Sequence, residues 1–441
     1  MRKNGRPAIY GLLIINLLLI FWGWWAGSHG LFASDLAGIL LAFGRLSGLL
    51  AVFGVLLEFV LIGRPLWLEK VFGFDRLAHY HHWNGFFSLF FIVLHPLLLG
   101  FSYAMDNQLT FWQQMADFFQ HYTFVDSATI AFFIFVIVVG ISFYLIRKKL
   151  KYELWLAVHW LVYLAVLLAF GHQLKLGGDL LSNKLFAGYW LALYLFVLIN
   201  LLFFRFMRPF WNYYRFACKV DRIERETPDT VSVYIRGKEL EKMGLQAGQF
   251  LSLRFLCRGF WLQAHPFSVS RLPEHDLFRI TVKNLGDYTA KIPQLKAGTK
   301  VMIEGPFGTF TAPRTGKHKY LFIAGGVGIT PILPLIKETA AGNDVVLLYG
   351  CRNLHDIIFY DELEEMKKKQ PFGLHIVLSN DQSTRHEKGR IDEEKLKRLV
   401  PDAVSREVYL CGPPAMIKTL LKTLADRGLP AGQIHYEKFS F

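Results

Sequence analysis

Hydrophobic and polar residues divide this chain into two halves. Apolar runs of about 20 residues, the length that a helix needs to cross a bilayer, recur through residues 9–210. They predict six membrane spans, over residues 9–25, 37–63, 80–101, 125–146, 154–174 and 185–206. Beyond residue 210 the apolar runs are short and alternate with charged residues, which predicts strands and helices outside the membrane.

The second half contains two successive patterns. Residues 216–310 alternate apolar and polar positions in runs such as QFLSLRF, FRITVKN and KVMIEG, which is typical of a small antiparallel barrel. From residue 319 a strand, a glycine-rich turn and a helix follow one another in KYLFIAGGVGITPILPLI, which predicts a doubly wound α/β domain. The predicted fold class is multidomain: an all-α bundle of six transmembrane helices (1–210), an antiparallel β-barrel (211–313) and an α/β doubly wound domain (314–441).

The distribution of positive charge predicts the orientation in the membrane. The chain has 441 residues and a net charge of +14. Alternate connections between the predicted spans collect the basic residues Arg2, Lys3, Arg6, Arg64, Lys70, Arg76, Arg147, Lys148, Lys149, Lys151, Arg205 and Arg208. The other connections hold only Lys175 and Lys184. Because cytoplasmic loops are enriched in Lys and Arg, we expect a multi-pass protein of the plasma or inner membrane with both termini cytoplasmic.

Other features of composition exclude several classes of protein. The basic balance reflects topology and contact with membrane lipid, and no basic stripe with interleaved aromatic residues indicates nucleic acid. The four cysteines are singly spaced in the second half, which argues against a disulfide framework or a zinc site and fits a reducing compartment. The first apolar run is long and lacks a small-residue cleavage site, so we interpret it as a retained span.

The predicted third span, HYHHWNGFFSLFFIVLH, has histidines at both ends. An ionisable side chain is costly in hydrocarbon and is a functional candidate there, although each histidine could instead lie among headgroups or bond a neighbouring backbone. His81 and His95 are 14 positions apart, which on a helix is about 21 Å along the axis and nearly the same face. His79 and His82 would point away from His95.

The predicted fifth span repeats this arrangement with His159 and His172. These residues are 13 positions apart and out of phase on an ideal helix, but Gly171 would allow local unwinding. Spans three and five run in the same direction, so they offer paired imidazoles at two depths. Two such pairs can hold two stacked haems, each iron bound by one histidine from each helix. We therefore predict His81 with His159 at the inner haem, and His95 with His172 at the outer haem.

The second half carries six motifs in order: HPFS (265–268), GDYT (286–289), GPFG (305–308), GGVGITP (325–331), YLCGPP (409–414) and EKFSF (437–441). This order resembles the flavoprotein module of ferredoxin–NADP reductases. This module follows six predicted spans that carry two histidine pairs. The whole arrangement resembles the NADPH oxidase and ferric reductase superfamily over nearly all of the chain. In that family, arginines matching Arg45 and Arg64 lie beside the outer and inner haem propionates. The alternative for Arg64 is an ordinary membrane anchor.

The resemblance implies an FAD site on the barrel. Phe267 is expected against the isoalloxazine and Ser268 near its reactive nitrogen. His265 takes the place of an arginine that faces the flavin pyrophosphate in many relatives, and Gly286 and Thr289 are expected at the phosphate or adenosine. The full FAD set is His265, Pro266, Phe267, Ser268, Val282, Lys283, Gly286, Tyr288 and Thr289.

The resemblance also implies a nicotinamide nucleotide site in the α/β domain. The expected residues are Gly325, Gly326, Gly328, Thr330, Pro331, Arg352, Cys411, Gly412 and Pro413. Cys411 would border the hydride path, and Phe441 would stack on the flavin as an aromatic cap. NADPH-selective relatives often have a Ser-Arg pair for the 2′-phosphate; here Ser379 is followed by Asn380, with Arg385 and Lys388 farther on. We therefore expect NADPH to be used with weaker exclusion of NADH. The expected catalytic set is Cys411, Phe441, Ser268 and Arg45.

The implied activity is transmembrane electron transfer from cytosolic NAD(P)H, through FAD and two b-type haems, to an acceptor on the other side. We expect dioxygen as the acceptor, reduced to superoxide; a ferric or other metal-chelate reductase is the alternative. Leu99 stands where animal oxidases have a further histidine, which bears on the oxygen site. A haem-free transporter or scaffold with a vestigial reductase module is a third interpretation. We also expect a bacterial form that is active with no obligatory regulatory subunit.

Overall fold

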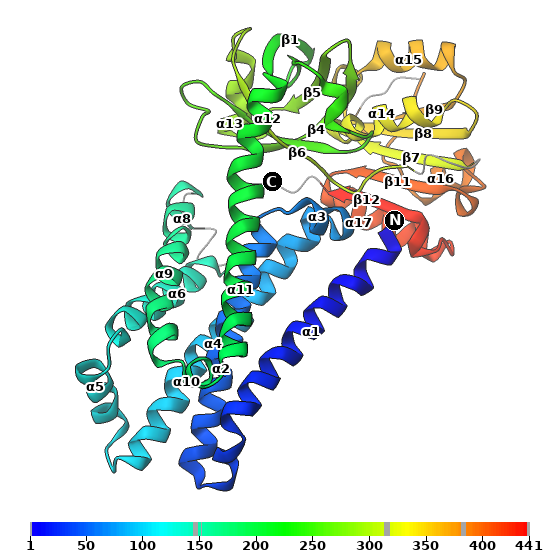
Figure 1. The fold of residues 1–441 in the computed structure, drawn as a ribbon. Coiled ribbons are helices and arrows are strands. Elements are labelled where there is room, and N and C mark those ends of the chain that lie inside the picture. The colour runs from blue at the N-terminus through cyan, green and yellow to red at the C-terminus, as the bar shows by residue number, and fades with distance from the viewer. Residues whose placement is uncertain (1, 144–148, 151, 313–317, 381–384, 439–441) are drawn as a thin grey trace. The chain divides into compact units, whose positions relative to one another are not determined.

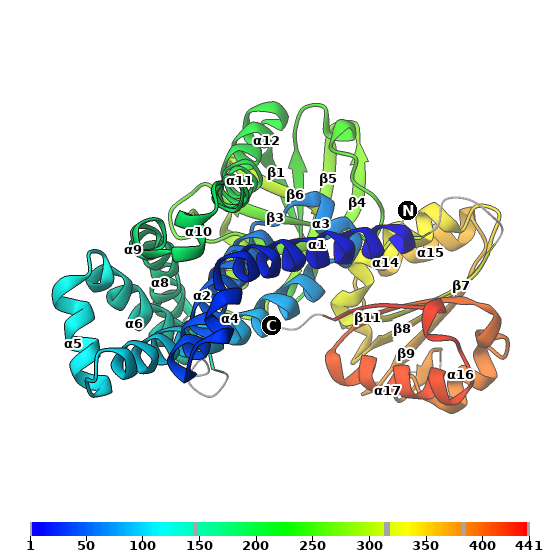
Figure 2. The same cartoon turned by 60° about the horizontal axis from the view of Figure 1, so that its bottom comes forward.

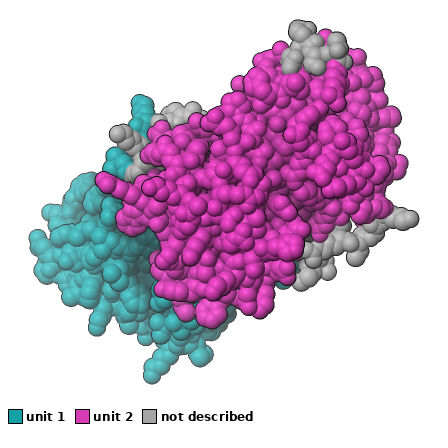
Figure 3. Space-filling model, turned by 90° about the horizontal axis from the view of Figure 1, so that it is seen from above, with its two compact units in different colours: residues 1–205 teal, residues 206–441 magenta. Residues whose placement is uncertain are grey.

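The computed structural model describes residues 2–143, 149–150, 152–312, 318–380 and 385–438 (Figure 1). The chain divides into two compact units, Met1–Arg205 and Phe206–Phe441 (Figure 3). Phe441, the expected flavin cap, lies outside the described residues.

The first unit is entirely helical. Its long helices are α1 (Arg2–Ser28), α2 (Leu36–Ile62), α4 (Phe74–Asp106), α6 (Val125–Ser142), α8 (Tyr152–His159) with α9 (Leu161–Leu176), and α11 (Lys184–Leu201). The shorter helices between them are α3 (Leu66–Phe72), α5 (Phe111–His121) and α10 (Gly178–Ser182). Within the described residues, 6 helical segments are long and apolar enough to cross a membrane, which confirms the predicted bundle.

Small residues let α2 and α4 pack closely. A Cβ on Gly48 would lie 2.8 Å from the ring of His95, and one on Gly54 would lie 2.4 Å from Oγ of Ser88. Such small residues allow two helix backbones to approach in a membrane, where apolar burial alone does not drive association. The close packing brings the polar groups of α4 within reach of the α2 backbone.

The fifth span is interrupted at a different position from the one that we expected. α8 and α9 are separated at Trp160, where the N–H of Tyr163 donates to the carbonyl of Trp160 at 3.1 Å. A bond over three residues makes a tighter turn than the α-helix, and it directly follows His159. The helix is continuous at Gly171, where a Cβ would lie 2.8 Å from the ring of Phe124. Gly171 therefore serves close packing.

The second unit begins at the end of a continuous helix, in which α11 passes through π-helical turns (Leu202–Met207) into α12 (Arg208–Phe216). A sheet of β1 (Lys219–Thr227), β2 (Thr230–Arg236), β3 (Phe250–Phe255), β4 (His265–Glu274), β5 (Leu277–Lys283) and β6 (Val301–Phe307) follows. The strand order is β1-β2-β5-β4-β3-β6, with antiparallel pairs. Two hydrogen bonds join the edges of this sheet. The N–H of Val220 donates to the carbonyl of Thr299, and the N–H of Val301 donates to the carbonyl of Cys218, each at a distance of 2.9 Å. These bonds close the predicted antiparallel barrel.

The rest of the second unit is a parallel sheet covered on both faces. Its strands are β7 (Lys319–Gly325), β8 (Asp344–Cys351), β9 (Gly373–Leu378), β10 (Glu387–Lys388), β11 (Glu407–Gly412) and β12 (Ile434–Lys438), in the order β10-β9-β8-β7-β11-β12. Helices α14 (Ile329–Thr339) and α15 (Tyr360–Lys369) cover one face, and α16 (Glu393–Leu399) and α17 (Pro414–Asp426) cover the other (Figure 2). This confirms the doubly wound fold. Strand order reverses between β7 and β11, and such a switch point is the usual ligand site of these sheets.

Candidate functional site

The membrane bundle brings the four predicted histidines together as two pairs. The ring centroids of His81 and His159 are 6.0 Å apart, and those of His95 and His172 are 6.2 Å apart. Two metal–nitrogen bonds of about 2 Å, plus the distance from each nitrogen to its ring centre, add to roughly that separation. The rings therefore fit a metal with two axial imidazoles, as in a b-type haem. No group of three or more His, Cys, Asp or Glu side chains suited to a metal ion occurs among the described residues.

The Nδ1 atoms of these four histidines have different surroundings. Nδ1 of His95 lies 2.8 Å from the carbonyl oxygen of Gly44, and Nδ1 of His81 contacts a carboxylate oxygen of Glu58. Nδ1 of His159 and of His172 is buried without a hydrogen-bond partner in the described part of the chain. Sequence reasoning did not single out Glu58, although an acid in the apolar run of the second span was a visible signal.

The two neighbouring histidines of α4 lie elsewhere. His82 is exposed and stands edge-on to Phe86, with ring centroids 5.0 Å apart. His79 is exposed and stands edge-on to Trp83, at 6.3 Å. Both rings thus pack against aromatic side chains of α4 itself.

Arg45 has an acidic partner at the end of the bundle near α10. Its guanidinium lies 3.7 Å from Oδ1 of Asp179 and 3.4 Å from the carbonyl oxygen of Gly27. Asp179 is 3% exposed; burial raises the pKa of this carboxyl, while Arg45 and Ser28 lower it. The location of Arg45 and Arg64 beside haem propionates stays a prediction. The guanidinium of Arg64 lies 5.1 Å from the ring centroid of Phe74.

The predicted flavin residues gather on adjacent strands and one turn of the barrel. The rings of His265 and Tyr288 lie 3.8 Å apart, and the hydroxyl of Tyr288 is buried without a hydrogen-bond partner among the described residues. Burial raises the pKa of Tyr288 and lowers that of His265. The remaining residues of this set on β4 and β5 are Pro266, Phe267, Ser268, Val282 and Lys283. Phe267 belongs to the buried core cluster of the barrel.

The turn before the short helix α13 (Asp287–Lys291) is organised by Thr289. Its Oγ1 accepts hydrogen bonds from the N–H groups of Leu285 (2.9 Å) and Gly286 (3.0 Å), and lies 3.0 Å from the carbonyl of Gly286. Nζ of Lys283 pairs with Asp229 at 3.0 Å. Thr289 therefore shapes the backbone at which the flavin phosphate or adenosine is expected.

The glycine-rich turn after β7 packs against the turn after β11. A Cβ on Gly328 would lie 2.2 Å from the carbonyl oxygen of Cys411, and one on Gly412 would lie 3.1 Å from Cα of Gly325. Gly326 has a φ of +52°, which favours glycine. The two glycine-containing turns thus approach each other closely at the switch point, beside the start of α14, where N–H groups can receive phosphate.

The other predicted nucleotide residues surround this turn. Thr330 is buried and its hydroxyl donates to the carbonyl of Val327 at 2.9 Å; Pro331 is buried beside it. Arg352 and Pro413 are exposed, just beyond the ends of β8 and β11. Cys411 is fully buried, and burial raises the pKa of its thiol.

A buried tyrosine that sequence reasoning missed supports the same turn. The hydroxyl of Tyr349 lies 3.2 Å from the carbonyl oxygen of Gly326 and accepts from the N–H of Ile358 at 3.1 Å. Tyr349 is 0% exposed. Because a buried hydroxyl needs hydrogen-bond partners, the tyrosine in the strand VVLLYGCR was a usable signal for a structured loop nearby.

Three family models match the chain. A ferric reductase like transmembrane component matches residues 47–170, an FAD-binding domain matches 216–311, and an oxidoreductase NAD-binding domain matches 322–422. The transmembrane match contains His81, His95 and His159. The FAD-binding match covers the barrel, and the NAD-binding match contains the switch point. The chain has a ferric reductase and NADPH oxidase-like architecture. It is a multi-pass membrane protein, and we call Met1–Arg205 the membrane domain and Phe206–Phe441 the reductase module.

Individual relatives match about half of this chain. The glycine betaine monooxygenase reductase subunit of Chromohalobacter salexigens is 27% identical over 241 residues, 52% of this chain and 65% of the relative. The ferredoxin reductase component of 3-ketosteroid-9-alpha-monooxygenase of Rhodococcus rhodochrous is 30% identical over 237 residues, 50% of this chain and 64% of the relative. A solved cytochrome P450 reductase of Amycolatopsis aligns with a TM-score of 0.46 at 24% identity, over 50% of this chain and 68% of that one. The chain spans less than two thirds of the length of these curated relatives.

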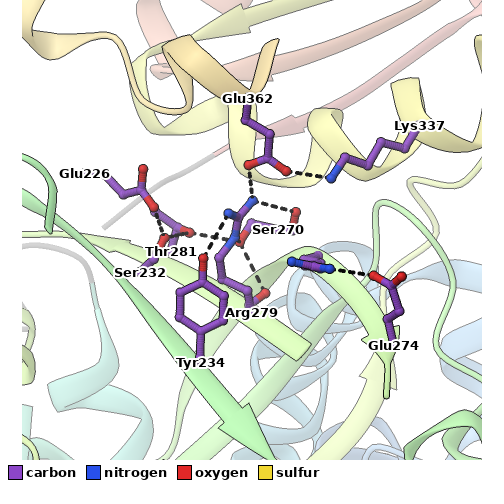
Figure 4. A network of polar contacts seen from close by, with 10 residues as sticks. Glu226, Ser232, Tyr234, Ser270, Glu274, Arg279, Thr281, Lys337 and Glu362 are labelled. Carbon is purple, nitrogen blue, oxygen red and sulfur yellow. Dashed lines mark hydrogen bonds and ion pairs between the residues drawn. The ribbon is translucent and has the colours of Figure 1, made fainter. Parts of the chain in front are cut away.

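Within the reductase module, a buried arginine joins the FAD-binding barrel to the NAD-binding domain (Figure 4). Arg279 on β5 donates to Oγ of Ser270 at 3.0 Å and to Glu362 on α15 at 2.9 Å. Its guanidinium lies 4.1 Å from the ring centroid of Phe359, and Lys337 on α14 contacts the other oxygen of Glu362 at 2.5 Å. Although burial raises the pKa of Glu362, Arg279 and Lys337 hold it below its ordinary value.

A basic groove of about 490 Å³ lies beside β9 and β10. Its lining residues are Leu374, His375, Ile376, Arg385, His386, Glu387, Lys388, Lys395 and Arg398. Arg385 and Lys388 in this groove follow Ser379 and Asn380 in the sequence.

Proposed function

We propose that this protein transfers electrons across a membrane from NAD(P)H to dioxygen, which is reduced to superoxide. The observation that carries the proposal is the two pairs of facing imidazoles, at separations that suit axial metal ligation, in a chain that also contains FAD- and NAD-binding domains. When bound, FAD would accept hydride from NAD(P)H, and two b-type haems would relay single electrons across the bilayer.

The residues of this chain would bind and orient those groups. His81 with His159 would hold one haem, and His95 with His172 would hold the other. In the reductase module, the N–H groups after β7 would receive the nucleotide phosphates, and Tyr349 would hold that turn in place. His265 and Tyr288, whose ring centroids are 3.8 Å apart, would lie beside the flavin.

The orientation proposal rests on charge and on one contact. Nε1 of Trp67, on α3, donates to Asn200 near the end of α11 at 3.2 Å, and the chain leaves the membrane domain five residues later. The start of α4, and with it His81, therefore lies at the end of the bundle from which the reductase module continues. Because the basic residues Arg64, Lys70 and Arg76 lie in or beside α3 at this end too, we assign it to the cytoplasm of a plasma or inner membrane.

A ferric or other metal-chelate reductase of the same architecture is the alternative function. Two imidazoles on each iron would leave no open position, so dioxygen and a chelate would both be reduced by outer-sphere transfer. The polar residues near α5 that would receive a chelate are Asp106, Asp117 and His121. His121 and Gln114 already bond Asp117, at 2.8 and 3.0 Å, which favours dioxygen.

The test combines a spectrum with a competition between acceptors. Detergent-purified protein should show two b-type haems per chain in its reduced-minus-oxidised absorption spectrum. With FAD and NADPH, it should reduce cytochrome c in a reaction that superoxide dismutase suppresses, faster than it reduces a ferric chelate. A protein without b-type bands would refute the haem proposal, and reduction that is insensitive to the dismutase but rapid with chelate would favour the alternative.

A further inference from the structure

The two candidate haem ligands of α4 have chemically different partners. Nδ1 of His81 contacts a carboxylate oxygen of Glu58, whereas Nδ1 of His95 meets the backbone carbonyl of Gly44 at 2.8 Å. Both partners lie on α2. In the pair of His81 and His159, the histidine of α4 thus contacts an acidic side chain. In the pair of His95 and His172, the histidine of α4 contacts a neutral backbone carbonyl.

Glu58 is held in place by an amide on the same helix as His81. Nδ2 of Asn84 donates to Oε1 of Glu58 at 2.6 Å and to the carbonyl oxygen of Gly54 at 2.8 Å. The side chain of Glu58 is 13% exposed. Asn84 lies one helical turn after His81, so both polar side chains of α4 converge on the one carboxyl group.

A buried carboxyl group in an apolar span is costly unless it is paired. A structural polar contact between α2 and α4 would explain the bond to Asn84. It would not explain why a titratable acid, rather than a backbone carbonyl as at His95, is placed against a ring that faces His159 on its other side.

We propose that Glu58 is a positioning residue for His81 that makes the inner haem more reducing than the outer one; this rests on the haem ligation proposed above. When Nε2 of a neutral imidazole binds a metal, its remaining proton is on Nδ1. An acidic acceptor at Nδ1 fixes the ring and raises the basicity of the ligand, which favours the oxidised metal and lowers its reduction potential.

The difference between the Nδ1 partners of His81 and His95 would lower the potential of the haem at which electrons enter. Electrons entering at the His81 end would move from the haem of lower potential toward the haem at His95, whose Nδ1 meets the backbone carbonyl of Gly44. The difference between a carboxyl and a carbonyl acceptor would therefore favour transfer away from the reductase module.

The test compares Glu58→Gln with Ser88→Ala in the full-length protein. Ser88 is a matched control because its side chain is buried in the same α2–α4 interface and its hydroxyl donates to the carbonyl of Asn84 at 2.8 Å. Both haem potentials are measured by spectroelectrochemical titration, together with haem per chain. The outer haem is identified as the one lost in His95→Ala.

For Glu58→Gln, we expect the reduction equilibrium of the inner haem to shift at least tenfold toward the reduced form, about 59 mV for one electron, with the outer haem unchanged. Ser88→Ala should move neither. Selective loss of the inner haem from Glu58→Gln, with the outer haem retained, would also support the positioning role. Asn84→Ala, which keeps the carboxyl but frees it, should shift the inner haem in the same direction by less.

Unchanged potentials with both haems retained would make Glu58 a structural contact and overturn the proposal. Equal changes at both haems, or in Ser88→Ala as well, would also overturn it. Absence of b-type haem from the wild-type protein is a separate outcome, which would refute the proposed function itself.

Discussion

At the scale of single residues, helical phase separates the histidines of α4. His81 faces His159 with ring centroids 6.0 Å apart, whereas His82 and His79 stand against aromatic neighbours. We predict that His81→Ala loses one of two haems per chain, while His82→Ala and His79→Ala retain both. Pyridine haemochrome assays on protein of known FAD content would measure this. Haem loss in His82→Ala with retention in His81→Ala would reverse the assignment.

The turn after β7 permits a second prediction at residue scale. A methyl group on Gly328 would meet the carbonyl of Cys411 at 2.2 Å, so Gly328→Ala must displace one of the two turns at the switch point. We expect NADPH binding to weaken at least tenfold while FAD and haem content stay unchanged. Gly432→Ala is the control, because a Cβ at Gly432 meets nothing within 4 Å. Isothermal titration with NADP⁺ would distinguish the two, and equal affinities would show that the turn has room to adapt.

Some of these residues can be predicted from the sequence, and others cannot. The spacing of His81 and His95 predicts a shared face because both lie on one continuous helix. Glu58 and Tyr349 were missed, since each acts through a partner that only packing brings close. Their own sequence context, an acid or a tyrosine within an apolar run, marks them as buried polar groups but does not name the partner.

At the scale of elements, periodicity predicts where helices and strands lie better than where they break. The third span is one helix from Phe74 to Asp106, as its pattern indicated. The fifth span breaks at Trp160 rather than at Gly171. A glycine signals either unwinding or close packing, and the sequence alone does not distinguish these two uses.

The ion pair between Arg279 on β5 and Glu362 on α15 predicts a difference in stability between two variants. Arg279→Met would leave Glu362 buried with Lys337 as its remaining cation, and removing one partner of a buried pair costs about 3–5 kcal/mol. Because Glu362 is 25% exposed, we expect about 3 kcal/mol of lost stability in the reductase module. Arg271→Met is the control: its pair with Glu274 is 40% and 56% exposed, and such pairs contribute about 0–1 kcal/mol. Thermal unfolding followed by flavin fluorescence in the full chain would compare them.

The same pair predicts a pH dependence. Arg279 and Lys337 lower the pKa of Glu362 from its ordinary value of 4.5. A carboxyl whose folded-state pKa is lowered contributes stability that is fully present above the unfolded value and is lost as pH falls through the folded one. The difference in unfolding temperature between wild type and Arg279→Met should therefore shrink below pH 4.5. A difference that stays constant down to pH 3 would show that the pair contributes no proton-linked stability.

At the scale of the whole molecule, the sequence predicts the domains because each has its own period: long apolar runs, then alternation by two, then alternating strands and helices. Closure of the barrel and the strand order β10-β9-β8-β7-β11-β12 are not encoded in local periods, since they depend on pairings distant in sequence. The switch point, and with it the position of the glycine-rich turn, follows from that order. The motifs indicated the nucleotide site, and the topology explains why it lies there.

The proposed orientation predicts the direction of electron transfer across the membrane. If the His81 end and the reductase module face the cytoplasm, inside-out vesicles expose the nucleotide site to the medium and release superoxide into the lumen. NADPH added outside should then reduce cytochrome c trapped in the lumen, and luminal superoxide dismutase should suppress this. His172→Ala should abolish the luminal signal, because it breaks the pair at the far end of the bundle, while leaving reduction of FAD by NADPH unchanged. Right-side-out vesicles should oxidise no added NADPH. Superoxide found only in the outer medium of inside-out vesicles, and equally in His172→Ala, would mean that electrons leave from the flavin and that the histidine pairs do not carry them across.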